Sequence, residues 1–187
     1  MNKKELYKLL KDCGVIMEGH FLLTSGRHSN LFMQCSQLLQ YPEKTAQICR
    51  LMAQPFLDKG VETVIGPAMG GIILSYETAR QLQARAVFTE QAGDKMVLRR
   101  GFSIKKRERV LIVEDAVTTG GSVQKVIDIL RNTGADLVGL SVLIDRAPNP
   151  PNFGLEMKSL LKVDVESYFP GECPLCRSDI PLQSPKN

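Results

Sequence analysis

The chain has 187 residues, of which 43% are hydrophobic and 24% charged, and its formal net charge is +4 at pH 7. This length suits one compact domain, and so small a positive surplus does not by itself indicate a nucleic-acid-binding protein. Aromatic residues make up only 6% and Trp is absent, which argues against the base-stacking surface of a single-strand binder, and no apolar run approaches the ~18 residues of a membrane span.

The N-terminal part predicts a helix followed by a hairpin. Leu6, Leu9 and Leu10 repeat at helical spacing and form the apolar face of an amphipathic helix. Acidic residues within this segment interrupt the apolar core that a signal peptide would need, so we expect a cytoplasmic protein without membrane contact. The segment HFLLTSGRHSNLFMQC (20–35) is hairpin-like, and together with the helix it is expected to form a hood.

From residue 61 onward, strands alternate with helices. Strands are expected at 61–67, 85–90, 109–115 and 135–146, and helices at 70–84 and 121–132, the second ending at Gly134. In the first of these helices the apolar positions are Ile73, Leu74, Tyr76, Ala79 and Leu82. This alternation predicts an α/β fold with a mainly parallel twisted sheet flanked by helices.

We therefore predict a single domain over residues 1–187 with three parts. About 1–60 would be the N-terminal helix and hood, about 61–146 the α/β core, and about 147–187 a C-terminal extension that begins with a proline-rich stretch.

The segments that follow the predicted strands contain small, hydroxyl-bearing or charged residues, and ligands of open parallel sheets bind at these strand ends. They read GPAMGG (66–71), EQAGDK (90–95), EDAVTTGGS (114–122) and DRAPN (145–149). In the third, hydroxyl groups and close backbone approach precede a helix N-terminus, which favours a phosphate. Neither the lysine of a Walker loop nor a dinucleotide motif is present, so nucleoside triphosphates and dinucleotides are disfavoured.

Glu114 and Asp115 directly precede this loop. Carboxylates would repel a phosphate, but they accept hydrogen bonds from the hydroxyls of a sugar and can hold Mg²⁺ or its waters. Successive strand side chains point to opposite faces, so the pair is not expected to act as one twin base unless the chain turns there. The pattern indicates a phosphorylated ribose, against the alternative of two solvated carboxylates at a strand end.

VLIVEDAVTTGGS (110–122) resembles the phosphoribosyl-pyrophosphate motif of the type I phosphoribosyltransferases. Four further segments resemble the orotate branch of that family. They are its hood loop FLLTSGRHSNLF (21–32), its pyrophosphate loop GPAMGG, its mobile catalytic loop KMVLRRGF (95–102) and the strand VLIDR (142–146), whose arginine contacts orotate. The tail ECPLCRSDIPL (172–182) looks like that of one bacterial group within the branch.

The resemblance implies a Mg²⁺-dependent transfer of the phosphoribosyl group from 5-phosphoribosyl 1-pyrophosphate (PRPP) to orotate, which gives orotidine 5′-monophosphate and pyrophosphate in pyrimidine biosynthesis. It assigns PRPP binding to Glu114, Asp115, Ala116, Val117, Thr118, Thr119, Gly120, Gly121 and Ser122, with Gly70 and Gly71. It assigns orotate binding to Thr118, Arg146, Phe32 and Met33. Mg²⁺ would be held mainly through PRPP, with water bridges to Glu114 or Asp115.

The catalytic residues implied are Asp115 and the basic residues Lys95, Arg99 and Arg100. In the family this basic loop reaches into a neighbouring site, which implies a homodimer; the alternative is a solvated basic face. The best-known branch has lysines where this chain has Thr24 and Gly70, and a Lys-x-His run that this loop lacks. Which basic residue neutralises most of the pyrophosphate charge therefore stays open.

Two other functions keep the phosphate loop. A purine-type phosphoribosyltransferase should lack the combination of TSGRHS (24–29) and Arg146, which suits a carboxylated pyrimidine. A non-catalytic module that senses PRPP would be favoured by an added DNA-binding segment, and none is recognisable in the sequence.

The five cysteines are odd in number and are expected to be reduced thiols. Cys173 and Cys176 form a lone C-x-x-C, whereas zinc normally takes four ligands. A zinc site would need a second pair from Cys13, Cys35, Cys49 or another subunit, so plain thiols are favoured. His28 is expected to have a structural rather than a catalytic role.

Overall fold

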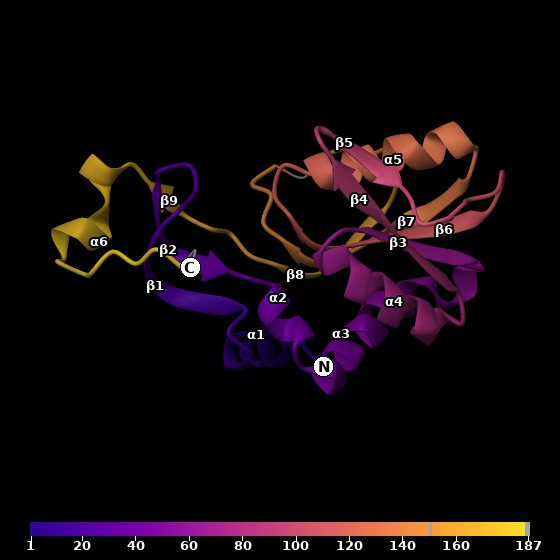
Figure 1. Ribbon diagram of the computed structural model, residues 1–187. Helices are drawn as coiled ribbons and strands as arrows, with labels where there is room; N and C mark the ends of the chain where they lie inside the picture. The colour runs from indigo at the N-terminus through magenta and orange to yellow at the C-terminus, as the bar shows by residue number, and fades with distance from the viewer. Residues whose placement is uncertain (150, 186–187) are drawn as a thin grey trace. The chain divides into compact units, whose positions relative to one another are not determined.

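The computed structural model describes residues 1–149 and 151–185 (Figure 1). Its contacts divide the chain into two compact units, one made of Met1–Leu38 with Val163–Asn187 and the other of Leu39–Lys162. We call the first the hood unit and the second the core unit. The C-terminal extension thus groups with the N-terminal helix and hairpin, and the core begins earlier and ends later than its expected bounds of about 61 and 146.

The core unit is a six-stranded sheet in the order β5-β4-β3-β6-β7-β8. Its strands are β3 (Thr63–Pro67), β4 (Arg85–Ala92), β5 (Lys95–Leu98), β6 (Arg109–Val117), β7 (Asp136–Asp145) and β8 (Met157–Lys162). Its helices are α3 (Pro42–Ala53), the 3-10 helix η1 (Gln54–Lys59), α4 (Gly70–Leu82) and α5 (Gly121–Thr133); a short helix, α2 (Ser36–Leu39), spans the boundary of the units. All neighbouring strands are parallel except β4 and β5. The predicted α/β class with a mainly parallel sheet is confirmed.

Helices cover both faces of this sheet, with α5 on one side and α3 and α4 on the other (Figure 1). The central strand β6 is buried on both faces, since Val110 and Ile112 pack in the cluster with α5 while Leu111 has the opposite parity and is also fully buried. α5 buries Val123, Val126, Ile127 and Leu130, and it ends, as predicted, at Gly134, whose φ of 73° suits a residue without a side chain.

The predicted apolar face of α4 is only partly correct. Leu74 and Ala79 are buried, but Ile73 and Tyr76 are 44% and 68% exposed. The buried stripe of α4 contains small residues as well as apolar ones, so a count of apolar positions placed the face incorrectly.

Besides η1, three elements of the core unit were not predicted. α3 lies within residues 1–60, where only the N-terminal helix and the hairpin of the hood were expected. β5 is a short edge strand within a polar stretch, and β8 extends the sheet after the proline-rich segment. The edge strands β5 and β8 carry lysines and few buried side chains, so they lack the continuous apolar run that marks a central strand.

The hood unit contains α1 (Lys3–Asp12), a three-stranded sheet in the order β1-β2-β9, and short helical turns η2 (Pro170–Glu172) and α6 (Pro174–Arg177). Its strands are β1 (Ile16–Leu22), β2 (His28–Met33) and β9 (Ser167–Tyr168), paired antiparallel. The predicted hairpin is therefore present, and α1 buries Leu6 and Leu10 as expected.

The C-terminal tail lies beside β1. Gln183 forms a parallel bridge with Phe21, and its backbone N–H donates to the carbonyl of His20 at 2.8 Å. Its own carbonyl accepts from the N–H of Leu22 at 2.9 Å. The hairpin thus contacts the C-terminal segment on both strands, since β9 pairs with β2 and Gln183 pairs with β1. Within residues 1–149 and 151–185, no helix has the length and apolar character to cross a membrane.

Candidate functional site

The loop after β6 encloses a cavity of about 280 Å³ at the carboxyl end of the core sheet. It is lined by Glu114, Ala116, Val117, Thr118, Thr119, Gly120, Gly121, Ser122, Val123 and Lys125. Most of these residues belong to the predicted phosphate loop. The cavity therefore forms where a strand end, a loop rich in hydroxyl groups and a helix N-terminus meet.

Gly120 determines how this loop enters α5. It is the N-cap of α5 with φ of 76°, a left-handed conformation in which a side chain is strained. A Cβ atom at this position would also lie 2.5 Å from the ring of Phe153. The loop can thus turn directly into α5, whose free N–H groups and positive dipole end favour an anion in the cavity.

A second cavity of about 230 Å³ adjoins the first. It is lined by the loop between β3 and α4 and by the end of β6, through Pro67, Ala68, Met69, Gly70, Glu114, Asp115, Ala116 and Ser122. Glu114, Ala116 and Ser122 border both cavities. One ligand could therefore extend from the anion-binding loop to the two carboxyl groups.

The two carboxyl groups lie close together in a poorly solvated place. Burial, and after it the charge of the neighbouring Asp115, raises the pKa of Glu114 to about 8. The pKa of Asp115 is also raised, mainly by burial. The backbone N–H of Asp115 donates to Glu114 Oε1 at 3.1 Å. Although strand alternation separates successive side chains, both groups border the second cavity, where they would attract a cation or hydroxyl donors.

Gly70 lies directly against this pair. A Cβ atom on Gly70 would be 2.3 Å from Asp115 Oδ2, so a side chain at this position would displace the carboxylate. This contact gives a physical reason for glycine where the best-known branch has lysine. Gly71, also expected at the ligand, is instead buried against Gly66, where a Cβ on either residue would meet the backbone of the other. Gly71 lines neither cavity.

Arg146 follows β7 at the same end of the sheet. Its backbone N–H donates to the carbonyl of Val117 at 2.8 Å, which places Arg146 beside the start of the phosphate loop. The preceding Asp145 is buried, and its carboxylate accepts from the N–H of Ala147 at 2.9 Å. The backbone of the half-buried Arg146 is thus hydrogen-bonded to the residue that precedes Thr118, although its side chain lines neither cavity.

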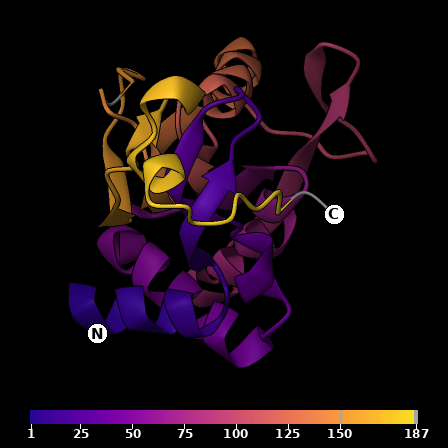
Figure 2. The same ribbon diagram turned by 90° about the vertical axis from the view of Figure 1, so that its left-hand side faces the viewer.

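The three basic residues of the predicted catalytic loop lie on or just after β5 and line neither cavity. Lys95 and Arg99 are exposed. Arg100 is bound to Glu90, with its Nη2 at 2.7 Å and its Nε at 3.1 Å from the same oxygen. The β4–β5 hairpin that carries them stands at the edge of the sheet in Figure 2.

Lys125 is a cavity residue that the sequence reasoning missed. It lies one turn into α5, borders the first cavity, and donates from Nζ to the carbonyl of Asp94 at 3.0 Å. It therefore links the β4–β5 turn to the phosphate loop. Its position in the sequence could have indicated it. Lys125 comes four residues after Gly121, so it lies about one turn from the N-terminus of the predicted helix, close to the loop.

Phe32 and Met33 belong to the hood unit, on β2. Met33 is buried, whereas Phe32 is half-buried with its ring 5.8 Å from that of Phe21. The hood loop is held in place by Arg27, whose Nε donates to Ser167 Oγ at 2.9 Å and whose guanidinium lies 4.1 Å from the Phe169 ring.

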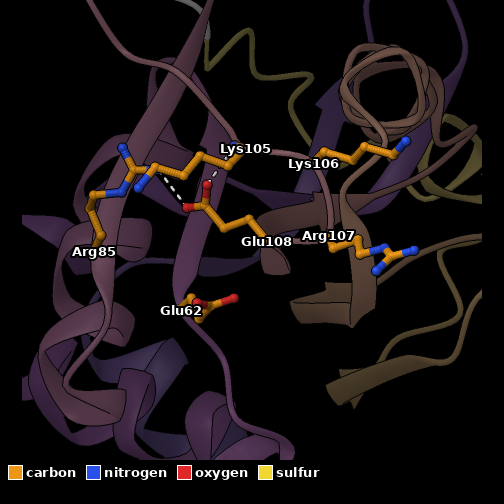
Figure 3. A pocket seen from close by; sticks show the side chains of 6 residues that line it. All are labelled: Glu62, Arg85, Lys105, Lys106, Arg107 and Glu108. Carbon is orange, nitrogen blue, oxygen red and sulfur yellow. Dashed lines mark hydrogen bonds and ion pairs between the residues drawn. The ribbon is translucent and has the colours of Figure 1, made fainter.

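A different cavity, of about 470 Å³, lies at the amino ends of the strands and is lined by Glu62, Arg85, Lys105, Lys106, Arg107 and Glu108 (Figure 3). Glu108 points toward Arg85 and accepts from Arg85, from Thr63 and from the backbone N–H of Lys105. These donors keep the pKa of Glu108 lowered despite its burial. We interpret this network as a stabilising contact at the end of the sheet that lacks the phosphate loop.

Comparisons with known proteins agree with this geometry. The family model for the phosphoribosyl transferase domain matches residues 34–150. A protein of Desulforamulus reducens named orotate phosphoribosyltransferase is 48% identical over 185 residues, which cover 99% of this chain and 97% of that protein.

Solved structures share the fold. The crystal structure of orotate phosphoribosyltransferase from Aeropyrum pernix has a TM-score of 0.73 and 27% identity, and the match covers 84% of this chain and 93% of that one. An adenine phosphoribosyltransferase from Rhodothermus marinus has a TM-score of 0.68 and 20% identity, over 87% of this chain and 100% of that one. The fold alone therefore does not select the acceptor.

Proposed function

Because the chain belongs to the orotate phosphoribosyltransferases of the phosphoribosyl transferase domain family, we propose that its two adjoining cavities together bind PRPP. The reaction of this enzyme class transfers the phosphoribosyl group of PRPP to orotate and yields orotidine 5′-monophosphate and pyrophosphate, a step of pyrimidine biosynthesis. The observation that carries our assignment of the site is the border that the cavities share at Glu114, Ala116 and Ser122.

The first cavity takes the 5-phosphate in this proposal. The hydroxyls of Thr118, Thr119 and Ser122 and the free N–H groups of α5 can donate to its oxygens, and Lys125 adds positive charge. Such fixed donors hold the ribose in one orientation before the reaction begins, which removes part of the entropic cost of reaching the transition state.

The second cavity takes the ribose hydroxyls and the pyrophosphate. Displacement at the anomeric carbon develops positive charge on the ribose ring, which the Glu114 and Asp115 carboxyl groups stabilise. In the free protein their raised pKa values favour retention of a proton. Hydroxyl donors or a cation at this place would release that proton, so substrate binding itself charges the pair.

Carboxylate oxygens are suitable donors for Mg²⁺, and Glu114 and Asp115 supply them beside the cavity that would hold the pyrophosphate. We propose that these two residues bind Mg²⁺ through water while PRPP supplies its other ligands. When bound, Mg²⁺ neutralises charge on the leaving pyrophosphate. This proposal rests on the donor set alone.

We assign orotate to Arg146 and Thr118 of the core unit. A guanidinium binds a carboxylate through two parallel hydrogen bonds, so Arg146 distinguishes orotate from bases without a carboxyl group. The backbone hydrogen bond from Arg146 to Val117 supports this role because it holds the arginine next to the phosphate loop.

We also propose a homodimer in which Lys95, Arg99 or Arg100 serves the partner's site. The support is an exposed apolar stripe formed by Met69, Ile73 and Tyr76 at successive turns around the start of α4, with Met69 83% exposed. A second copy of the chain would bury this stripe. The pair between Arg100 and Glu90 would have to open for Arg100 to reach pyrophosphate.

A cytoplasmic location is our further proposal. It is supported by the five cysteines, none of which forms a disulfide in the structure, as expected in a reducing compartment.

The test follows orotate consumption with Mg²⁺ and PRPP, in parallel with hypoxanthine, guanine and uracil. Of the four bases, only orotate is expected to react with PRPP. Turnover only with a purine would refute the assignment of orotate as the acceptor. Arg146→Ala should raise the KM for orotate about tenfold or more, with a much smaller effect on the KM for PRPP. The matched control is Arg50→Ala, at an exposed position near the end of α3. Equal effects of Arg146→Ala on both substrates would contradict its assigned role.

A further inference from the structure

Four potential metal ligands meet inside the hood unit. They are His20 on β1, His28 at the start of β2, and Cys173 and Cys176 at α6. Their ligand atoms all lie within 4.8 Å of one another, and all except Cys176 are buried residues. They come from parts of the chain as much as 156 residues apart, the separation of His20 and Cys176.

Three sulfur-to-nitrogen distances within this cluster match those of a tetrahedral site. The Sγ atom of Cys173 is 3.5 Å from His20 Nε2, and that of Cys176 is 3.7 Å from His20 Nε2 and 3.3 Å from His28 Nδ1. Zinc bonds of about 2.3 Å to sulfur and about 2.0 to 2.1 Å to nitrogen, at tetrahedral angles, place sulfur about 3.5 Å from nitrogen. The two nitrogens are 2.9 Å apart, a few tenths of an ångström closer than the about 3.3 Å of the same geometry.

The other ring nitrogen of His20 is already oriented for such a site. His20 Nδ1 lies 2.7 Å from the carbonyl oxygen of Ile180. A carbonyl only accepts, so Nδ1 carries a proton, and Nε2 is the ring nitrogen that faces the cluster and can bind a metal. A histidine that ligates a metal typically donates its second N–H to a backbone carbonyl in this way.

We propose that His20, His28, Cys173 and Cys176 bind one structural Zn²⁺ ion. Sulfur and imidazole ligands in a tetrahedral arrangement select zinc over Mg²⁺ or Ca²⁺, which prefer oxygen. With all four positions taken by the protein, no position is open for substrate, so this site is separate from phosphoribosyl transfer. Two histidines of the same chain supply the second ligand pair for the C-x-x-C. The sequence alone suggests other cysteines or another subunit as the source of such a pair.

The position of this site suggests its role. It joins the C-terminal tail to the β1–β2 hairpin, which carries the hood loop (21–32). The tail otherwise meets β1 through Gln183, and the segment before it holds Arg27 through Ser167 and Phe169. A small unit with few buried side chains gains stability from a metal that binds only its folded form.

Metal analysis of the full-length chain tests the proposal. The protein is purified without chelators or immobilised metals from cells supplied with zinc, and about one zinc ion per chain is expected. Cys173→Ser combined with Cys176→Ser should lose the zinc, whereas Cys13→Ala, at a buried cysteine of the same unit outside the cluster, should retain it. Absence of zinc from the wild-type chain, even after incubation with Zn²⁺, would overturn the proposal.

A second measurement uses only the wild-type chain, so it does not depend on the folding of variants. After chelation, addition of Co²⁺ should produce the absorption bands of tetrahedral cobalt with thiolate ligands, and Zn²⁺ should abolish them. A spectrum of octahedral cobalt without thiolate bands would refute the site. A Cys173–Cys176 disulfide would also refute it, and would appear as a deficit of reactive thiols in denaturant with chelator. None of these readouts depends on orotate turnover.

Discussion

Glu114→Gln offers a direct test of the buried carboxyl pair. Glu114 is 6% exposed and borders both cavities, and its pKa is raised to about 8 from an ordinary value of 4.5, first by burial and then by Asp115. The folded chain therefore binds the proton more tightly than the unfolded chain. Between about pH 4.5 and about pH 8 the free energy of unfolding of the wild type should fall as pH rises.

The magnitude follows from the two pKa values. Their difference of about 3.5, multiplied by 1.36 kcal/mol, gives about 5 kcal/mol as an upper limit, which sharing of the proton with Asp115 will reduce. Glutamine has the same shape and does not ionise, so Glu114→Gln should approach the wild type in stability at about pH 5 and exceed it by several kcal/mol at about pH 9.

The assay is urea unfolding followed by circular dichroism, without Mg²⁺ or PRPP, from about pH 5 to about pH 9. The control Glu43→Gln changes an exposed carboxylate on α3 and should give a curve parallel to that of the wild type. A parallel curve for Glu114→Gln as well would show that Glu114 is solvated, and the reasoning about the pair would fail. The same variant should turn over orotate more slowly, because it cannot place a negative charge beside the ribose.

Three further substitutions test the cavity walls. Gly70→Ala places a methyl group 2.3 Å from Asp115 Oδ2, so the carboxylate must move, and kcat/KM for PRPP should fall about tenfold or more by steady-state kinetics. Gly120→Ala combines a φ of 76° with a contact of 2.5 Å to Phe153, and thermal unfolding should reveal a loss of about 1 to 3 kcal/mol. Lys125→Ala removes a charge from the first cavity, and it should raise the KM for PRPP about tenfold.

Each substitution has a control of the same type. Gly171→Ala enters open space and should leave kinetics unchanged; Gly14→Ala has a φ of 74° without a close contact, so it isolates the backbone cost. Lys4→Ala removes an exposed lysine of α1 far in sequence from the phosphate loop. If Gly70→Ala behaved like Gly171→Ala, the close approach of Asp115 would have no functional consequence. If Lys125→Ala behaved like Lys4→Ala, Lys125 would not belong to the phosphate site.

The core of the fold was predictable because its signals are local. Buried strands such as β6 consist of nearly continuous apolar residues, and α5 shows both an apolar face and a glycine stop. The edge strands β5 and β8 were missed, since their pairing partners rather than their own composition make them strands. The exposure of Ile73 and Tyr76 could not be predicted from the sequence either. Apolar residues recur at the same helical spacing whether they pack in the core or form a surface that another molecule covers.

Within the site, the sequence predicted the loop after β6 and the adjacent carboxyl pair, because strand end, glycine turn and helix start follow one another within 110–122. Tertiary structure alone decided how Glu114 and Asp115 share a cavity with the β3–α4 loop, and why Gly70 must lack a side chain. Packing of separate segments, which local patterns do not encode, sets such distances.

The cysteine pair makes the same distinction most clearly. The sequence alone favours plain thiols for the C-x-x-C, because it shows no second ligand pair, and it predicts a structural role for His28. The fold brings Cys173 within 3.5 Å of His20, a residue 153 positions away, because the tail returns to pair with β1. The sequence by itself thus determined the enzyme family and predicted a phosphoribosyl site, whose proposed residues are neighbours in the chain. Only the tertiary structure decided the four-ligand cluster, whose residues become neighbours when the chain closes on itself.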